Sequence, residues 1–145
     1  RDIYRLSLAV MRDFPQYYSY FTIPQFNFRG AVMPNHNHLL RTMPGVDGIK
    51  TGFTNAAGFT LAASATRDGR RLIAVVLGGP SRVARDGNVE SLLASGFSVL
   101  AARQRGSKVQ VADLLAEPGD LNDAILSALV EQGSADPGEG PRPRR

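Results

Sequence analysis

Cysteine is absent from this 145-residue chain and lysine is scarce, since only Lys50 and Lys108 among its 17 basic residues are lysines. Without cysteine the chain can form neither a disulfide framework nor a thiolate metal site, although an oxidising compartment stays open. No apolar run approaches the roughly 18 residues of a membrane-spanning helix. No charged start followed by an apolar stretch marks a signal peptide within the sequence.

The composition is that of a globular protein. Hydrophobic residues make up 43% of a 15.6 kDa chain, enough to bury one core, so we expect one domain or part of one. The net charge is +4 and the isoelectric point is about 10. Such a charge suits anionic partners such as nucleic acid, acidic lipid or cell wall, and it does not choose among them.

The first half of the chain predicts a helix followed by an irregular connection. Apolar residues in residues 2–14 recur on one helical face, and Pro15 ends the pattern. That face consists of Ile3, Leu6, Val10 and Phe14. Residues 16–43 are rich in aromatic residues, asparagine and proline, with a candidate short strand at 25–30 and a candidate loop at 33–40.

Three strand candidates and a long helix follow. The strands are expected at residues 48–54, 58–66 and 71–79, and Asp-Gly in the turn at 67–70 suits a tight antiparallel hairpin. Residues 82–104 carry apolar side chains on one helical face, so this helix should pack back onto the sheet. The apolar face consists of Val89, Leu92, Leu93, Phe97 and Leu100.

The sequence indicates three parts. Residues 1–104 contain the elements above and are expected to form one folded unit. Residues 105–132 contain two further apolar stretches, KVQVADLLAE and NDAILSALVE, which predict a short C-terminal extension. Residues 133–145, GSADPGEGPRPRR, are of low complexity and are expected to be disordered.

The tripeptide Lys50-Thr51-Gly52 is the first chemical candidate. Alone it is weak evidence, because a strand that ends in a glycine turn can contain it by chance. Serine enzymes that recognise penicillins and D-alanyl peptides use the same element. A lysine ammonium assists proton transfer, a threonine hydroxyl binds a carboxylate, and a glycine lets substrate approach the backbone.

The surroundings of this tripeptide carry a family resemblance. The segments are, in order, RDIYRLSLAVMRDFPQYYSYF, HNHLL, VDGIKTGFTNAAGFTLAASATRDGRRLIAVVLGG and LLASGF. Over about residues 1–104 the chain resembles the serine D-alanyl-D-alanine carboxypeptidases, the low-molecular-weight penicillin-binding proteins. The resemblance implies the C-terminal portion of a β-lactamase/transpeptidase-like fold of the α/β (α+β) class, with a mainly antiparallel sheet flanked by helices.

The resemblance also implies a function. Such enzymes remove the terminal D-alanine of peptidoglycan pentapeptides through an acyl-enzyme, need no cofactor, are inhibited by β-lactams and act in the periplasm or at the cell surface. Many carry a C-terminal amphipathic helix as a membrane anchor. The tail of this sequence contains none, so membrane association of a longer protein stays open.

The family's site residues transfer to five positions. Lys50 would assist proton transfer, Thr51 would hold the substrate carboxylate and Gly52 would admit the substrate. The backbone N–H of Phe53 would form half of an oxyanion hole, or its side chain could line the cleft by packing. Arg85 matches an arginine near the substrate carboxylate, and a solvated arginine at the start of a helix is the alternative.

Two elements of the family are missing. No serine stands three residues before either lysine, so the nucleophile element Ser-x-x-Lys is absent, and no Ser-x-Asn occurs. We expect both upstream in a longer protein, which makes this chain inactive alone. The alternatives are a catalytically dead module that binds cell wall or a partner, and a β-lactamase-related enzyme. A nucleic-acid-binding fragment rests on charge alone, because no such motif occurs.

The remaining candidates favour structural roles. His36 and His38 would point to one side of an extended segment, but no further ligand cluster accompanies them, so we expect loop hydrogen bonds and no metal site. Asp47 is expected to be a structural acid and not a general base. No nucleophile elbow, zinc-protease helix or phosphate-binding loop occurs.

Overall fold

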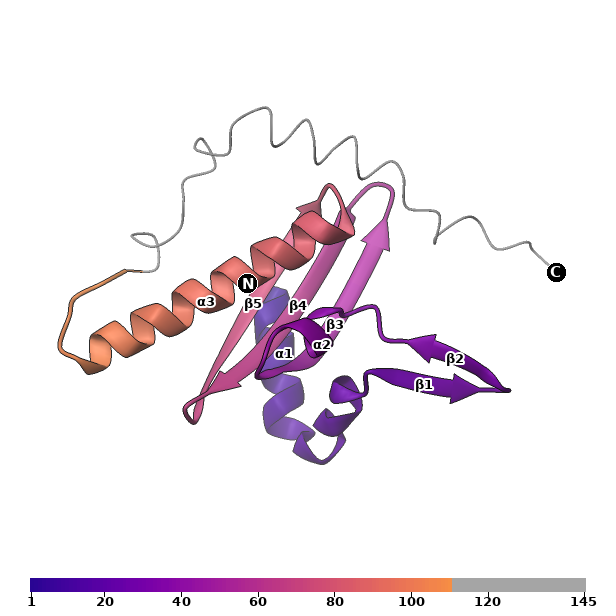
Figure 1. Ribbon diagram of the computed structural model, residues 1–145, viewed down its shortest axis with the longest axis horizontal. Helices are drawn as coiled ribbons and strands as arrows, with labels where there is room; N and C mark the ends of the chain where they lie inside the picture. Colours follow the sequence, from indigo (N-terminus) through magenta and orange to yellow (C-terminus); the bar gives the residue numbers. More distant parts are fainter. Residues whose placement is uncertain (111–145) are drawn as a thin grey trace.

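The computed structural model describes residues 1–110 (Figure 1). Its helices are α1 (Asp2–Asp13), the 3-10 helix η1 (Pro15–Thr22), α2 (Leu39–Thr42) and α3 (Arg82–Gln104). Its strands are β1 (Gln25–Phe28), β2 (Ala31–Pro34), β3 (Val46–Thr54), β4 (Gly58–Arg67) and β5 (Arg70–Gly79). The predicted C-terminal extension lies mostly, and the predicted disordered tail wholly, outside the described residues, so this division of the chain stays a prediction.

The central sheet contains β3, β4 and β5 in sequence order, and both neighbouring pairs are antiparallel, as predicted. Asp68 and Gly69 both have positive φ, at 50° and 71°, between the paired residues Arg67 and Arg70. Positive φ at both central positions is typical of a type I′ turn, whose twist matches that of the flanking strands. The Asp-Gly turn therefore fixes the register of β5 against β4.

One face of the sheet packs against α3 and contains the core. Ser81 caps the helix, since its hydroxyl accepts a hydrogen bond from the N–H of Ala84 at 3.1 Å. The predicted apolar face of α3 is confirmed: Val89, Leu93 and Phe97 are buried, with Leu92 and Leu100 packed against them. The strands contribute Leu61, Ala63, Ala65 and Ala74 to the same cluster. The small side chains of the three alanines let the helix lie close to the sheet.

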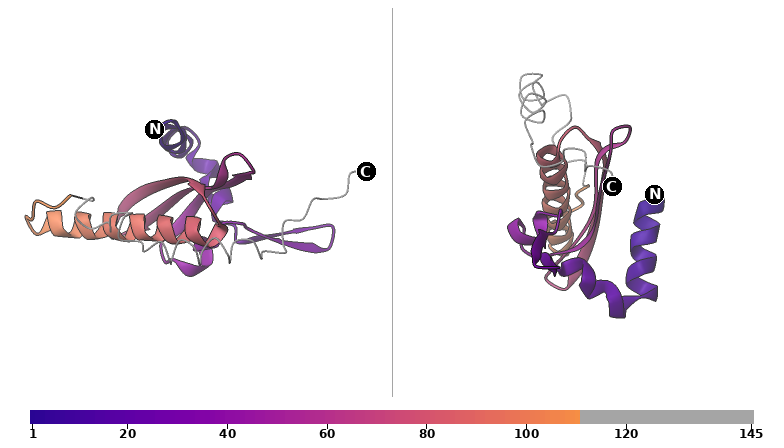
Figure 2. Two further views of the ribbon diagram at one scale, coloured as in Figure 1. Left: turned by 90° about the horizontal axis from the view of Figure 1, so that it is seen from above. Right: turned by 90° about the vertical axis from the view of Figure 1, so that its right-hand side faces the viewer.

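The opposite face of the sheet is covered by α1 and η1, so helices lie on both faces as predicted (Figure 2). This layer is much less tightly packed. Of the predicted apolar face of α1, Ile3 is 44%, Leu6 62% and Phe14 52% exposed. The periodicity of α1 therefore predicted the helix correctly, but within residues 1–110 only part of its apolar face is covered.

The segment at 16–43 is more regular than its composition indicated. The strand predicted at 25–30 is present as β1, but its partner β2 runs into the predicted loop, and α2 occupies its end. Arg29 and Gly30 have φ of 49° and 84°, which makes a two-residue turn and closes a hairpin. The hairpin extends away from the sheet (Figure 1), and all its residues are exposed.

Among residues 1–110, no helix is both long and apolar enough to cross a membrane.

Candidate active site

Lys50 and Thr51 lie in the middle of β3, which forms one edge of the three-stranded sheet. Lys50 pairs with Ala62 on β4, and residues opposite each other in an antiparallel pair present their side chains on the same face. Gly48 and Gly52 flank Lys50 on that face, which is the one covered by α1 and η1. The Lys50 side chain is exposed, and its ammonium donates a hydrogen bond to the Thr51 carbonyl at 2.5 Å.

A cavity of about 280 Å³ lies beside this part of β3, between α1, η1 and the sheet. Its lining consists of Ile3, Leu6, Ser7, Val10, Phe21, Ile49, Lys50, Thr51, Thr60, Leu61, Ala62 and Leu77. Lys50 is the only charged residue in this lining. The Lys50 side chain is exposed at the side of this hollow, where its charge can attract an anionic or developing negative group.

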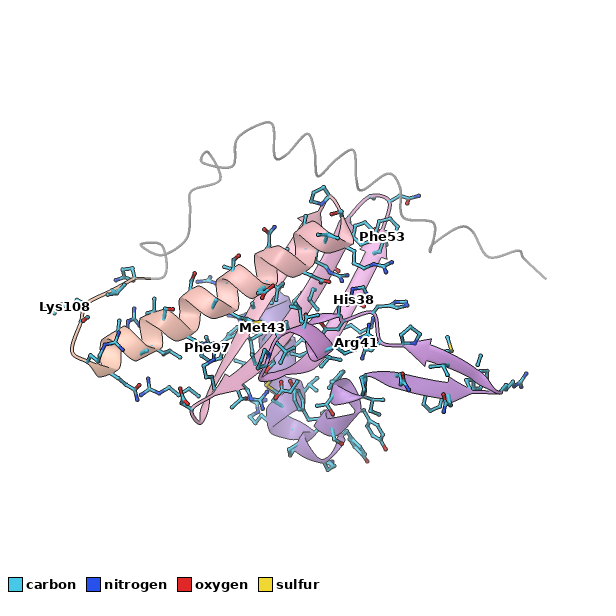
Figure 3. The ribbon with its side chains drawn as sticks, viewed as in Figure 1. His38, Arg41, Met43, Phe53, Phe97 and Lys108 are labelled. Carbon is cyan, nitrogen blue, oxygen red and sulfur yellow. The ribbon has the colours of Figure 1, made fainter. Side chains whose placement is uncertain are left out.

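Gly52 faces Thr60 of β4 with little space between them. A Cβ atom at this position would lie 2.7 Å from the hydroxyl oxygen of Thr60, closer than real side chains allow. The next residue, Phe53, stands near the end of β3 (Figure 3) and packs on Phe59 with ring centroids 4.4 Å apart. Its side chain is 46% exposed. The Phe53 ring is therefore used in packing, and an oxyanion role at this position would belong to the backbone N–H, which does not depend on the side chain.

Arg85 is buried, with only 2% of its surface exposed, so the interpretation as a solvated arginine is wrong. Its Nε donates to the Asp86 carboxylate at 2.9 Å, and its Nη2 lies 3.4 Å from the main-chain oxygen of His36. The arginine thereby joins the start of α3 to the segment before α2. The sequence alone does not reveal these contacts of Arg85, because two adjacent residues of opposite charge form no periodic pattern.

The His-Asn-His segment lies against the site through its asparagine. Asn37 is 3% exposed, and its side-chain amide donates to the carbonyl of Gly48 on β3 at 3.0 Å. His38 lies near α2 (Figure 3), with Nδ1 3.8 Å from an Asp86 oxygen. Burial lowers the pKa of His38 below its usual 6.5 and nearby arginines add to this, outweighing the attraction of Asp86. At neutral pH His38 is therefore uncharged and forms no ion pair.

No group of three His, Asp or Glu side chains within residues 1–110 is arranged to hold a metal ion. His38 faces the single carboxylate of Asp86, and Asp86 is already engaged by Arg85.

Asp47 is part of a polar cluster that the sequence did not indicate. Arg71 Nη1 lies 2.7 Å from one Asp47 oxygen and donates to the hydroxyl of Ser64 at 2.6 Å. Tyr18 donates to the other Asp47 oxygen at 3.1 Å. Burial raises the pKa of Tyr18 to about 12, so the phenol keeps its proton near neutral pH. Asp47 is fully engaged here, in line with the predicted structural acid.

Comparisons with known proteins agree with the motif. A family model described as D-alanyl-D-alanine carboxypeptidase matches residues 1–81. The D-alanyl-D-alanine carboxypeptidase DacA of Escherichia coli K12 is 42% identical over 98 residues, which are 67% of this chain and 24% of that protein. The match covers 29% of the length of DacD from the same organism. The chain thus spans about a quarter of the length of these curated relatives.

Solved structures give the same result. Penicillin-binding protein 5 from Haemophilus influenzae superimposes with a TM-score of 0.59 and 40% identity, over 62% of this chain and 27% of that one. Penicillin-binding protein D2 from Listeria monocytogenes, in its cefotaxime-bound form, gives a TM-score of 0.62 and 33% identity, over 66% of this chain and 39% of that one. These neighbours confirm the predicted transpeptidase-like fold, and the chain belongs to the D-alanyl-D-alanine carboxypeptidase family.

Proposed function

We propose that this chain is the C-terminal part of the catalytic domain of a longer serine D-alanyl-D-alanine carboxypeptidase. The observation that carries the proposal is the position of Lys50-Thr51-Gly52 on an open edge strand, beside an apolar cavity where Lys50 is the charged group. The nucleophile element Ser-x-x-Lys and the Ser-x-Asn element are supplied by the part of the longer protein outside this sequence.

The reaction is a two-step acyl transfer. The serine hydroxyl attacks the carbonyl of the penultimate D-alanine, forming an ester with the peptide and releasing the terminal D-alanine, and water then hydrolyses the ester. The Lys50 ammonium stabilises negative charge that develops during attack and assists proton transfer to the leaving amine. The Thr51 hydroxyl donates to the terminal carboxylate, and the Phe53 N–H donates to the oxyanion.

Arg85 has a secondary role in this scheme. Its guanidinium already serves Asp86 and the His36 carbonyl, so it would have to leave a buried carboxylate to bind the substrate directly. Exchanging one buried charge pair for another gains little. We therefore assign primary recognition of the carboxylate to Lys50 and Thr51, and a supporting role to Arg85.

The substrate is the peptidoglycan pentapeptide, and β-lactams are inhibitors that acylate the same serine. Two of the similar solved structures, of the Listeria monocytogenes protein, are described as cefotaxime-bound and ampicillin-bound forms. A cell-wall substrate places the longer protein in the periplasm or at the cell surface, with membrane association left open. The acyl transfer uses protein groups and water, and no cofactor.

The longer protein is expected to form a covalent adduct with a fluorescent penicillin, whereas the 145-residue chain is not, because the chain lacks the nucleophile. In-gel fluorescence measures the adduct, and mass spectrometry of peptides locates it. Prior incubation with unlabelled ampicillin is the control and should remove the signal. Equal labelling of the isolated chain on one of its own serines would contradict the proposal, and no labelling of the longer protein would favour a binding module.

Replacing Thr51 with valine is expected to slow acylation by penicillin and by a D-alanyl-D-alanine peptide together. Valine keeps the shape of the side chain and suits a strand, but it deletes a hydrogen bond to a carboxylate, which is worth about 1.5 to 3 kcal/mol or about tenfold to a hundredfold in rate. Thr42→Val on α2 makes the same chemical change at an exposed threonine away from β3, so it is the matched control and should leave both rates unchanged. A Thr51→Val protein with normal rates would remove Thr51 from the site.

A further inference from the structure

The polar cluster at Asp47 connects all three strands of the central sheet. Asp47 belongs to β3, Ser64 to β4 and Arg71 to β5, and Tyr18 reaches them from η1. Arg71 Nη1 contacts both Asp47 and Ser64, and its guanidinium lies 5.1 Å from the centre of the Tyr18 ring. We call these four residues the strand clasp. They lie on the face of the sheet that Lys50 also occupies.

The clasp holds an irregular point of β3. Val46 pairs with Ala65 and Gly48 with Ser64, so Asp47 is the extra residue of a β-bulge. A bulge interrupts the ladder and redirects the side chains around it, and a one-residue slip would turn every side chain of the strand to the other face. Because β3 pairs with β4 alone among the strands of residues 1–110, its register here depends on side-chain contacts as well as on backbone hydrogen bonds.

The Tyr18 side chain packs on the backbone of Gly48, two residues before Lys50. A Cβ atom on Gly48 would lie 3.0 Å from the Tyr18 hydroxyl oxygen and 3.1 Å from Cβ of Phe21. Gly48 and Lys50 are two residues apart on one strand and therefore share a face. The Tyr18 hydroxyl, which donates to Asp47, thus also contacts the part of β3 that directly precedes Lys50.

The burial of the clasp argues against stabilisation as its main effect. The side chains of Arg71 and Asp47 are 38% and 23% exposed, and ion pairs with this much contact with water contribute little to folding. Geometry at an active site is far more sensitive. A displacement of about 1 Å can slow a reaction about a hundredfold.

We propose that Tyr18, Asp47, Ser64 and Arg71 are positioning residues, which set the placement of Lys50 and Thr51 for acylation by pinning the bulge of β3 to β4, β5 and η1. This inference rests on the proposed function of the longer protein. The four residues touch neither substrate nor nucleophile in the proposed reaction; they act through the backbone of β3.

The test uses the longer protein with Asp47→Asn, Arg71→Gln, the double variant and Tyr18→Phe. Stopped-flow acylation by a penicillin separates the dissociation constant of the first complex from the acylation rate constant, and urea unfolding reports stability. We expect about a tenfold to hundredfold lower rate constant for Asp47→Asn and for Arg71→Gln, with the dissociation constant and the urea midpoint nearly unchanged. Tyr18→Phe removes one hydroxyl and should show a smaller loss of the same kind.

The double variant distinguishes a clasp from two independent residues. If Asp47 and Arg71 act as a unit, the double variant is no slower than either single variant. Arg12→Gln is the matched control, because Arg12 forms an ion pair with Asp13 on the exposed surface of α1, and it should acylate at the wild-type rate.

Three outcomes would overturn the inference. Acylation of every clasp variant within about twofold of wild type would show that the clasp does not position Lys50. Fewer labelled molecules with an unchanged rate constant, together with a lower urea midpoint, would show a purely structural role. A wild-type protein that penicillin does not acylate would overturn the proposed function itself, and the inference with it.

Discussion

Replacing Lys50 with alanine is expected to lower the acylation rate constant of the longer protein by about a hundredfold to a thousandfold, since one electrostatic group of an oxyanion site is worth about 3 to 4 kcal/mol. The lysine is the charged member of an otherwise uncharged cavity lining, so no other residue of the lining can replace its charge. The measurement is the acylation rate constant with one penicillin and one D-alanyl-D-alanine peptide.

Lys50→Arg tests the role of the proton. Arginine keeps the charge, but it is larger and does not give up its proton near neutral pH, so this variant should also lose much of its activity. The sequence offers a matched control in its other lysine, Lys108, which follows α3 far from β3 (Figure 3). Lys108→Ala and Lys108→Arg should leave the rate unchanged. Near-normal acylation by Lys50→Arg would show that Lys50 supplies charge and does not handle a proton.

Replacing Arg85 with alanine is expected to lower the free energy of unfolding by about 3 kcal/mol, because removal of one partner leaves a largely buried carboxylate without its counter-charge. The side chains of Arg85 and Asp86 are 3% and 14% exposed. Urea unfolding of the longer protein measures the change. The matched control is Arg12→Ala, because Arg12 also pairs with the next residue, Asp13, but the side chains of that pair are 77% and 44% exposed. That variant should lose far less stability than Arg85→Ala, because water screens an exposed ion pair.

Acylation separates the two roles open to Arg85. We expect the folded fraction of the Arg85→Ala protein to acylate faster than the Lys50→Ala protein. The reason is that Arg85 contacts the His36 carbonyl and has only a supporting role in the proposed reaction. The double variant Arg85→Met, Asp86→Asn removes both charges and should recover part of the lost stability. If Arg85→Ala instead abolishes acylation with stability intact, while Lys50→Arg acylates normally, Arg85 becomes the primary residue that recognises the carboxylate.

The periodic parts of the fold could be predicted from the sequence. The helix α3 has one buried face, so the spacing of its apolar residues predicts it. The strand β4 is buried continuously from Leu61 to Ala65, and such a short apolar run next to a turn signal predicts a buried strand. The turn at Asp68-Gly69 contains the residue types that a type I′ turn prefers. The Lys50-Thr51-Gly52 element could also be placed on a strand, because the residues around it fit no helix.

Other features depend on contacts that leave no pattern in the sequence. The hairpin of β1 and β2 turns at Arg29, a residue type that rarely adopts positive φ. The helix α2 has only four residues, too few for a period to appear. The bulge at Asp47 and the burial of Arg85 both result from side chains that meet across the fold, Asp47 with Arg71 and Arg85 with the His36 carbonyl. The sequence therefore indicates candidate site residues, but it does not indicate the residues that contact and support them.

The close packing of α3 on the sheet has a mechanical consequence. Gly96 of α3 lies against Leu72 of β5, where an added Cβ would stand 2.8 Å from a methyl carbon, and buried alanines line the same contact on β4. To bend the sheet, the helix and strands would have to separate and lose dispersion contacts along their length. The helix α3 therefore stiffens the sheet along the face on which it packs. Any movement that closes around a ligand at Lys50 is left to the more loosely packed α1.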